Sequence, residues 1–478
     1  MDTFFFYDLE TSGRDPRWHR ITQFAGVRTD SSLTPVAAPV AWNVRLDGDV
    51  VPEPEACLIT GLTPARIADG IDEGELFRRI DAEFGRPRTC VVGYNNLRFD
   101  DEFVRYGFWR NLKDPYAREW QGGNSRWDLI DLARMAAALR PAGMVWPESD
   151  GRASFRLEEL AAANAIEQTR AHDALADVQA TVGLARALRL AQPELFDFYL
   201  GLRRKQRVAE VVGRPLGGAF VHVSSRYGAA SGRLAVVTPI AAHPVNRNSM
   251  IVADLSADIE ALERLDGVAL AAALFTPARE RGERPFIPLK EIHFNKVPAV
   301  APLGVLKAGD RQRLGIDLPR CLLHLERLRR APDLAERVQA AYAARPAWPR
   351  AEDVDGALYD GFLPDDDRRL LLELPAAYAE GQASPPPLAD ARARELAFRY
   401  LARRRPELLD AEGRARWQAH RHDLLIRGRD GMDGIPATRL RLDALAAEGA
   451  DVEILDALRA YLDQLEAEFA PIPSVATS

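Results

Sequence analysis

The stretch FYDLETSG, from Phe6 to Gly13, decides the fold of the N-terminal part of this chain. An apolar run, FFFY, leads into it, and two carboxylates, Asp8 and Glu10, follow with one leucine between them. Residues i and i+2 of a strand lie on the same face, so the two carboxylates would project together while the leucine turns into the core. Because like charges repel, such a strand needs a nearby cation or a solvated edge.

Two interpretations of this D-x-E stretch differ in their chemistry. An isolated D-x-E is most often a strand that ends in acidic turn residues. The alternative is a site for a divalent metal ion, which would need further carboxylates from later elements. The rest of the chain therefore has to decide between the two interpretations.

Length and composition describe a globular protein of several domains. The chain has 478 residues, 47% hydrophobic and 28% charged, and is too long for one core. Three widely spaced cysteines without a C-x-x-C pair indicate a reducing compartment. The N-terminus lacks the basic region of a secretion signal, and no apolar stretch approaches the roughly 18 residues of a membrane span. We therefore expect a cytoplasmic protein that does not contact membranes.

The spacing of apolar residues divides the chain into three parts. Residues 1–192 interleave strand-like and helix-like runs, which is the α/β pattern. Residues 193–348 contain short β-branched runs, such as AFVHVSS and LAVVTPI, broken by Gly, Pro and Asn, which predict a small β-rich domain. Residues 349–478 are rich in Ala, Leu, Arg and Glu at helical spacing, which predicts a helical domain.

The distribution of charge is more informative than its sum. The net charge is −7, yet residues 199–250 hold eight basic residues and one acid, Glu210. Binding of a polyanion follows the local potential rather than the net charge. This segment is equally consistent with a solvated charged surface and with a surface that binds a polyanion.

Further carboxylates follow at two later places. GYNNLRFDDEF puts Asp100 or Asp101 at the opening of a predicted helix, where an acid also serves as a cap. RAHDALADVQ places His172 five residues before Asp177, which is about 140° around a helix axis. The two can face one site only if His172 lies in the loop before the helix, with Asp173 as the N-cap.

This ordered set resembles the DEDDh family of 3′-to-5′ exonucleases, whose fold is similar to that of ribonuclease H. Longer blocks are similar to the bacterial exonuclease I family, which degrades single-stranded DNA: ITGLTPARI, NNLRFDD, GGNSRWDLID, SFRLEELAAANAIE, AAHPVNRNSMI and IHFNKVPAV. The similarity covers essentially the whole chain. It implies a ribonuclease H-like exonuclease domain over 1–192, an SH3-like β-rich domain over 193–348 and a helical domain over 349–478.

The resemblance implies an acidic site that binds two Mg²⁺ ions, with Mn²⁺ as a substitute. Its metal ligands are Asp8, Glu10 and Asp177. Asp100 completes the catalytic set, with the adjacent Asp101 as the alternative for that role. His172 is the general base that activates the attacking water.

The resemblance also implies contacts with DNA and with one protein partner. Glu10 and Arg156 would contact the terminal nucleotide, although Arg156 is also consistent with an ordinary helix-start arginine. Six further residues lie in the similar blocks, and their aromatic members are equally consistent with core positions: Arg105, Tyr116, Trp120, Arg134, His243 and Lys296. The acidic C-terminal tail of single-stranded DNA-binding protein is the expected partner, with contacts at Arg140, Phe198 and Arg313, where Phe198 replaces a family tyrosine.

The sequence therefore predicts a monomeric, metal-dependent exonuclease that degrades single-stranded DNA processively from its 3′ end to 5′ mononucleotides in DNA repair and recombination. A related DEDDh enzyme with another substrate is one rival, but such modules usually lack the two added domains. The other is a catalytically silent adaptor that binds single strands or the tail of the binding protein. Four intact carboxylates count against this adaptor.

Overall fold

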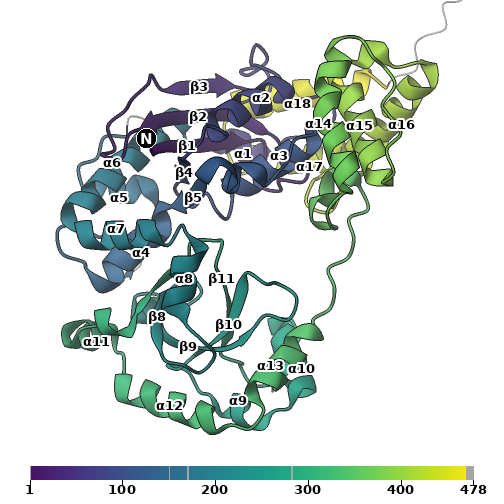
Figure 1. The fold of residues 1–478 in the computed structure, drawn as a ribbon. Coiled ribbons are helices and arrows are strands. Elements are labelled where there is room, and N and C mark those ends of the chain that lie inside the picture. Colours follow the sequence, from purple (N-terminus) through teal and green to yellow (C-terminus); the bar gives the residue numbers. More distant parts are fainter. Residues whose placement is uncertain (1, 150, 169–171, 281, 283, 470–478) are drawn as a thin grey trace, which may run out of the picture.

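A computed structural model describes residues 2–149, 151–168, 172–280, 282 and 284–469 of the chain. Residues 470–478, the end of the third predicted domain, lie outside the described residues. Figure 1 shows an α/β part, a β-rich part and a helical part in the predicted order. In the described part of the chain, no helix is both long and apolar enough to cross a membrane.

The first part is built on a five-stranded sheet with the order β3-β2-β1-β4-β5. β2 and β3 continue from β1 in antiparallel fashion, whereas β4 and β5 run parallel to it. The strands are β1 (Thr3–Thr11), β2 (Ile21–Thr29), β3 (Val40–Asn43), β4 (Thr89–Gly93) and β5 (Ser125–Asp128). β1 is therefore the central strand, and its carboxylates lie inside the sheet rather than at an edge.

Helices cover both faces of this sheet (Figure 1). They are α2 (Glu73–Phe84), α3 (Asp100–Arg110), α4 (Leu129–Leu139), α5 (Leu157–Ala163) and α6 (Ala174–Ala191), with a small hairpin of β6 (Glu148–Ser149) and β7 (Arg152–Ala153). The short helix α1 (Pro54–Thr60) packs instead against the last two helices of the chain. Phe5, Tyr7 and Leu9 pack into the core formed with α2 and α3. Phe4 and Phe6 pack into the core formed with α4, α5 and α6. The alternation places Asp8 and Glu10 on the α6 side of the sheet.

The second part contains an antiparallel sheet with the order β11-β10-β9-β8-β12. Its strands are β8 (Phe220–Val223), β9 (Leu234–Ala242), β10 (Ser249–Asp254), β11 (Leu289–His293) and β12 (Ala299–Pro302). Its helices are α7 (Pro193–Gly201), α8 (Lys205–Val212), α9 (Glu260–Arg264), α10 (Gly267–Phe275), α11 (Ala308–Leu314), α12 (Leu318–Arg330) and α13 (Leu334–Ala343). The Phe196 ring of α7 packs edge-on against Trp127 of β5 at 5.1 Å, so the first two parts share one continuous core.

The third part is helical and packs on the first. Its helices are α14 (Asp365–Ala379), α15 (Ala391–Arg404), α16 (Ala411–Arg427), α17 (Ile435–Ala447) and α18 (Val452–Ala467). Trp109 of α3 donates from its indole to the Val354 carbonyl at 2.8 Å. A buried group of ion pairs also joins the two parts, in which Arg403 of α15 lies 2.8 Å from Asp49 and contacts Asp355.

Candidate active site

Two carboxylates of the site lie on the central strand. Glu10 is 8% exposed and pairs in register with Gln23 of β2, just before a register shift at Thr11. Burial first, and then the charge of Asp177, raises the pKa of Glu10 to about 8. Burial and the charge of Asp100 raise the pKa of Asp8 well above its usual range. The strand thus holds two carboxylates where their ionised forms are costly without a cation.

The structure distinguishes Asp100 from Asp101, the adjacent residues that open α3. Asp101 is fully buried and accepts hydrogen bonds from Arg118 at 2.8 Å, Arg126 at 2.5 Å and the Tyr7 hydroxyl at 2.9 Å. Burial alone would raise the pKa of Asp101, but the two guanidinium groups hold that pKa well below its usual range. Its oxygens are therefore already engaged inside the fold.

Asp100 lies in the opposite electrostatic situation. It is 5% exposed, and none of the ion pairs among the described residues includes it. Burial raises the pKa of Asp100 to about 8, with the charges of Asp101 and Asp128 as further causes. Asp100 is also among the charges that raise the pKa values of Asp8 and Glu10. Of the two aspartates, Asp100 is the one whose charge faces the other carboxylates unneutralised.

The start of α6 supplies the remaining side chains. Asp173 accepts a hydrogen bond from the Ala176 amide and caps the helix, as the sequence predicts. His172 precedes the helix in the left-handed region, with φ of 61°, and is exposed. Asp177 lies in the first turn, and burial raises its pKa. The predicted loop position of His172 is confirmed.

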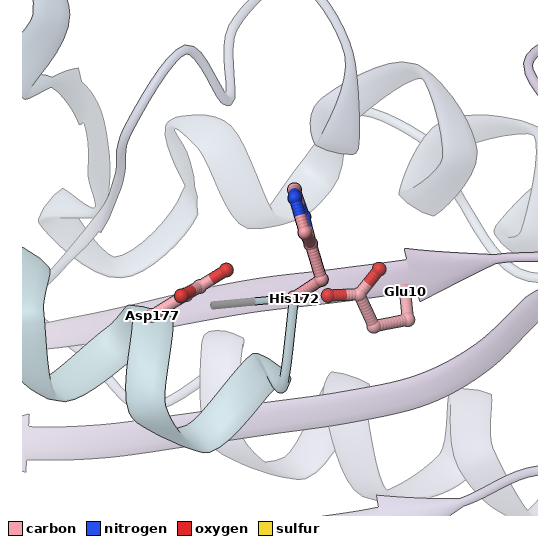
Figure 2. Close-up of side chains that lie close together, drawn as sticks. All are labelled: Glu10, His172 and Asp177. Atoms are coloured by element: carbon pink, nitrogen blue, oxygen red, sulfur yellow. The ribbon is translucent and has the colours of Figure 1, made fainter. Parts of the chain in front are cut away.

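The side chains of three residues converge: Glu10 from β1, His172 from the loop before α6, and Asp177 from α6 itself (Figure 2). One potential ligand atom of each lies within 4.8 Å of the others. Carboxylate oxygens are the ligands that hard divalent cations prefer. Binding of a cation would also stabilise the ionised forms of these clustered carboxyl groups, whose pKa values are raised. The donor set therefore fits a divalent metal ion.

The residues predicted to contact DNA are found in very different surroundings. Arg156 precedes α5 with its side chain 73% exposed, 3.8 Å from Glu159. Trp120 is also 65% exposed, whereas Tyr116 is half-buried. Arg105 is buried, and its guanidinium donates to Glu102 at 2.8 Å, to Glu119 at 2.9 Å and to the Tyr359 hydroxyl at 3.1 Å. Of these four residues, Arg156 and Trp120 therefore have the most accessible side chains.

Three further predicted DNA contacts are distributed over two domains. Arg134 donates to Asp131 at 2.7 Å and is mostly buried. The His243 ring is also mostly buried, and its Nδ1 accepts from the amides of Val245 and Asn246, which shapes a turn. Lys296 is exposed and lines a cavity of about 990 Å³ between the first two domains. Lys296 is thus the freest cation of the three.

The predicted contacts for the binding-protein tail lie around one aspartate. Arg140 Nη1 is 3.6 Å and Arg313 Nη2 is 3.3 Å from Asp310, so both arginines converge on the same carboxylate. Phe198 of α7 is partly buried against the shared core.

Sequence reasoning missed several partners of the site. It did not identify Arg118 and Arg126, which bind Asp101 from 17 and 25 residues away. It also missed Gln168, whose Nε2 donates to Asp177 Oδ1 at 2.6 Å. Arginines are frequent throughout this chain, so no local pattern marks these two.

Comparison with known families identifies all three parts. Residues 5–185 match the family described as Exonuclease, residues 203–344 match the Exonuclease I SH3-like domain, and residues 352–465 match the Exonuclease I C-terminal domain. The predicted fold class, a ribonuclease H-like domain followed by SH3-like and helical domains, is confirmed. The fold and the carboxylate site together define an exonuclease.

Whole-chain relatives give the particular family. Exodeoxyribonuclease I of Escherichia coli (strain K12) is 41% identical over 427 residues, which cover 89% of this chain and 90% of that protein. Exodeoxyribonuclease I of Haemophilus influenzae is 40% identical over 429 residues, with 88% and 90% covered. The chain belongs to the exonuclease I family, as the sequence predicts.

Solved structures agree over almost the full length. The moderately thermophilic Exonuclease I from Methylocaldum szegediense superimposes with a TM-score of 0.92 at 44% identity, covering 97% of this chain and 100% of that one. E. coli Exonuclease I in complex with a dA16 oligonucleotide gives 0.92 at 39% identity, covering 98% and 100%. A zinc-ion-bound form of an E. coli ExoI–ssDNA complex gives 0.91 at 38% identity, covering 98% and 100%.

Proposed function

We propose that this protein is a metal-dependent exonuclease that hydrolyses single-stranded DNA from its 3′ end and releases 5′ mononucleotides. The main observation behind the proposal is that ligand atoms of Glu10, His172 and Asp177 lie within 4.8 Å of one another. The nearby carboxyl groups of Asp8 and Asp100 both have raised pKa values. The E. coli Exonuclease I structures in complex with an oligonucleotide or with ssDNA support single-stranded DNA as the substrate.

The residues divide the work by their positions. Asp8, Glu10 and Asp177 would hold two divalent ions, and Asp100 completes the acidic set. When bound, such ions supply an activated water and stabilise the charge that develops on the leaving 3′ oxygen. Mg²⁺ fits a set rich in carboxylate oxygens, and Mn²⁺ accepts the same ligands.

His172 acts as the general base in this proposal. Its exposed position before α6 lets the imidazole reach a water held near Glu10 and Asp177, and an imidazole exchanges protons near neutral pH. The exposed guanidinium of Arg156 would contact the terminal nucleotide. Tyr116, Trp120 and Lys296 would contact the DNA strand farther from its 3′ end. Arg105, Arg134 and His243 would act mainly by shaping that surface, because their polar groups are engaged inside the fold.

A strand-cleavage assay tests the proposal. Single-stranded DNA labelled at its 5′ end, with a matched duplex as control, is incubated in Mg²⁺, Mn²⁺ or EDTA with the wild type, Asp8→Ala and Asp69→Ala, which removes an exposed carboxylate of the same domain. We expect metal-dependent shortening of the single strand that Asp8→Ala abolishes and Asp69→Ala retains. Binding of the strand by the wild type without cleavage in either metal would favour the adaptor instead.

We further propose that the acidic tail of single-stranded DNA-binding protein docks at Arg140 and Arg313, against Phe198. The two arginines share one carboxylate, Asp310, so an incoming acidic peptide would find them preorganised and incompletely neutralised. Fluorescence anisotropy with a labelled tail peptide should show weaker binding for Arg313→Ala and unchanged binding for Arg320→Ala on α12. Because the resemblance implies a tyrosine at the position of Phe198, Phe198→Tyr, which restores its hydroxyl group, should tighten binding of the peptide.

The cellular setting follows from the same activity. We propose a monomeric, cytoplasmic enzyme that works processively in DNA repair and recombination. Figure 1 shows the two added domains beside the exonuclease domain, and the longer surface that they would offer to a DNA strand supports processivity. Size-exclusion chromatography with light scattering measures the oligomeric state, and a trap of unlabelled DNA added after the first cut measures processivity.

A further inference from the structure

Three polar side chains form one row across the sheet of the exonuclease domain. Glu10 of β1 pairs in register with Gln23 of β2, and Gln23 pairs in register with Asn43 of β3. Side chains of directly opposed residues in antiparallel strands lie on the same face of a sheet. The row therefore runs from a predicted metal ligand, Glu10, outward along the face that α6 covers.

Gln23 connects this row to the start of α6. Its Oε1 accepts a hydrogen bond from the Ala174 amide at 2.9 Å, and its Nε2 donates to Asn43 Oδ1 at 3.2 Å. Ala174 is the first residue of α6, where the helix itself offers no acceptor for the amide. Because Ala174 is fully buried, loss of the Gln23 oxygen would leave this amide without a partner.

The Ala174 amide lies between two side chains of the candidate active site. His172 comes two residues before it, and Asp177 comes three residues after it. The bond from Ala174 to Gln23 joins this segment to the strand residue that lies opposite Glu10. The spacing between the carboxylates of β1 and α6 thus depends on one hydrogen bond between the sheet and the helix.

The helix cap at Asp173 has a different role. Asp173 accepts from the Ala176 amide of the same helix at 3.2 Å. It therefore shapes the first turn of α6 without fixing that turn to the sheet. Gln23 supplies the contact with the sheet.

A neutral amide suits this position for an electrostatic reason. The pKa of the Glu10 carboxyl group is already raised to about 8, by burial first and then by the charge of Asp177. A carboxylate at position 23 would add a further negative charge in the same row. Glutamine supplies the acceptor that the helix start needs without adding this charge.

We infer that Gln23 is a positioning residue of the active site, which holds the start of α6 at the distance from β1 that lets Glu10 and Asp177 bind one metal ion. Asn43 supports it by orienting the Gln23 amide with its oxygen toward the helix. The inference rests on the proposed function, in which Glu10 and Asp177 are metal ligands. Groups that support the ligands of a metal site typically change its affinity or activity by about 10–100-fold.

Metal binding in the absence of DNA tests the inference. The electron paramagnetic resonance signal of free Mn²⁺ measures the affinity of the full-length wild type and of Gln23→Met, which keeps the size of the side chain but removes its amide. Gln192→Met is the matched control, because Gln192 follows the other end of α6 and donates to the Ala142 carbonyl at 2.7 Å. Asp177→Asn is the reference for the loss of a ligand.

We expect Gln23→Met to weaken Mn²⁺ binding about 10–100-fold and Gln192→Met to leave it unchanged. Hydrogen exchange, measured by mass spectrometry on the peptide that begins α6, should be faster in Gln23→Met. Gln23→Glu should restore slow exchange and most of the Mn²⁺ affinity, because one new carboxylate oxygen accepts from Ala174 and the other accepts from the Asn43 amide. A glutamine that only stabilised the fold would change the unfolding midpoint without changing the metal affinity.

Asn43→Ala tests the order of action within the row. We expect a smaller loss of Mn²⁺ affinity than in Gln23→Met, and no additional loss when the two substitutions are combined, because Asn43 acts through Gln23. An additional loss in the double variant would overturn the role assigned to Asn43. If Gln23→Met does not fold, unchanged Mn²⁺ affinity in Asn43→Ala overturns the inference.

The Asp177→Asn reference separates failure of the inference from failure of the proposed function. Wild-type affinity in Gln23→Met together with weakened binding in Asp177→Asn overturns the inference alone. Wild-type affinity in both variants overturns the proposed metal site, and the inference falls with it. If the wild type binds Mn²⁺ but does not cleave DNA, the proposed function fails, while the Mn²⁺ affinities still decide the role of Gln23.

Discussion

The adjacent residues Asp100 and Asp101 should respond oppositely to the same isosteric change. Asp100→Asn removes a buried carboxylate that has no cationic partner among the described ion pairs. Asp101→Asn removes the shared partner of two buried arginines, Arg118 and Arg126. We expect the first variant to stabilise the metal-free protein and the second to destabilise it, although both remove one negative charge.

The raised pKa of Asp100 sets the size of the first effect. Its pKa lies at about 8 instead of 3.8, and each pH unit of difference corresponds to about 1.4 kcal/mol. The carboxyl group of Asp100 therefore lowers the free energy of unfolding by about 5 kcal/mol at pH 8. Because Asp8 and Glu10 share protons with it, we expect Asp100→Asn to recover about half of that cost, about 2–3 kcal/mol.

The pairing of Asp101 sets the second effect. Removal of one partner from a buried ion pair costs about 3–5 kcal/mol. Arg118 is 2% exposed and its ion pair is with Asp101, whereas Arg126 keeps Glu119 at 2.9 Å. For a domain of this size, 1 kcal/mol shifts the unfolding midpoint by about 2–4 °C, so Asp101→Asn should lower that midpoint by about 10 °C.

The pH dependence gives the two variants opposite signatures. The folded-state pKa of Asp100 is raised, so its destabilising effect is absent below pH 3.8 and grows until pH 8. The folded-state pKa of Asp101 is depressed, so its stabilising effect is full at neutral pH and fades only as the pH falls below 3.8. Thermal unfolding in EDTA followed by circular dichroism measures both. A loss of stability in Asp100→Asn equal to that in Asp101→Asn at pH 8 would refute this account.

Three further predictions follow from other parts of the molecule. Divalent metal affinity should rise with pH up to about 8, because Glu10 must lose its proton to bind; calorimetry in two buffers of different ionisation enthalpy measures that proton release. Arg403→Met should lower the free energy of unfolding in urea by about 3–5 kcal/mol, because it leaves the buried Asp49 without its closest cation, whereas Arg427→Met, which removes an exposed arginine of α16, should not. Gly107→Ala should cost about 1–3 kcal/mol, because the new methyl group would lie 1.8 Å from the Phe77 ring; Phe77→Leu in the same protein should restore part of that loss.

The sequence was sufficient for features that depend on local geometry. The two-residue period of β1 placed Asp8 and Glu10 on one face, and that face lies toward α6, which carries Asp177. The five-residue step from His172 to Asp177 required a loop before the helix, and Asp173 caps α6 as that geometry demands. Each of these inferences needs only the repeat of a strand or a helix.

Features that depend on distant partners were beyond the sequence pattern. Whether Asp100 or Asp101 faces the other carboxylates is decided by arginines 17 and 25 residues away, which the fold brings to one of the two. The resemblance implies that His243 and Arg105 contact DNA, yet in the folded chain His243 accepts hydrogen bonds within a turn and Arg105 donates to two glutamates and a tyrosine. A motif specifies the residue types, but the tertiary pairing decides which of them remain free.

The same reasoning explains how an acidic protein can handle a polyanion. The carboxylates that lower its net charge near the site belong to the carboxyl half of β1, where bound cations would neutralise them. The basic residues of segment 199–250 begin at Arg203, Arg204 and Lys205, beside the amino end of the same strand. The acidic and basic groups are therefore separated along β1, so the net charge of −7 describes the potential at neither end of the strand.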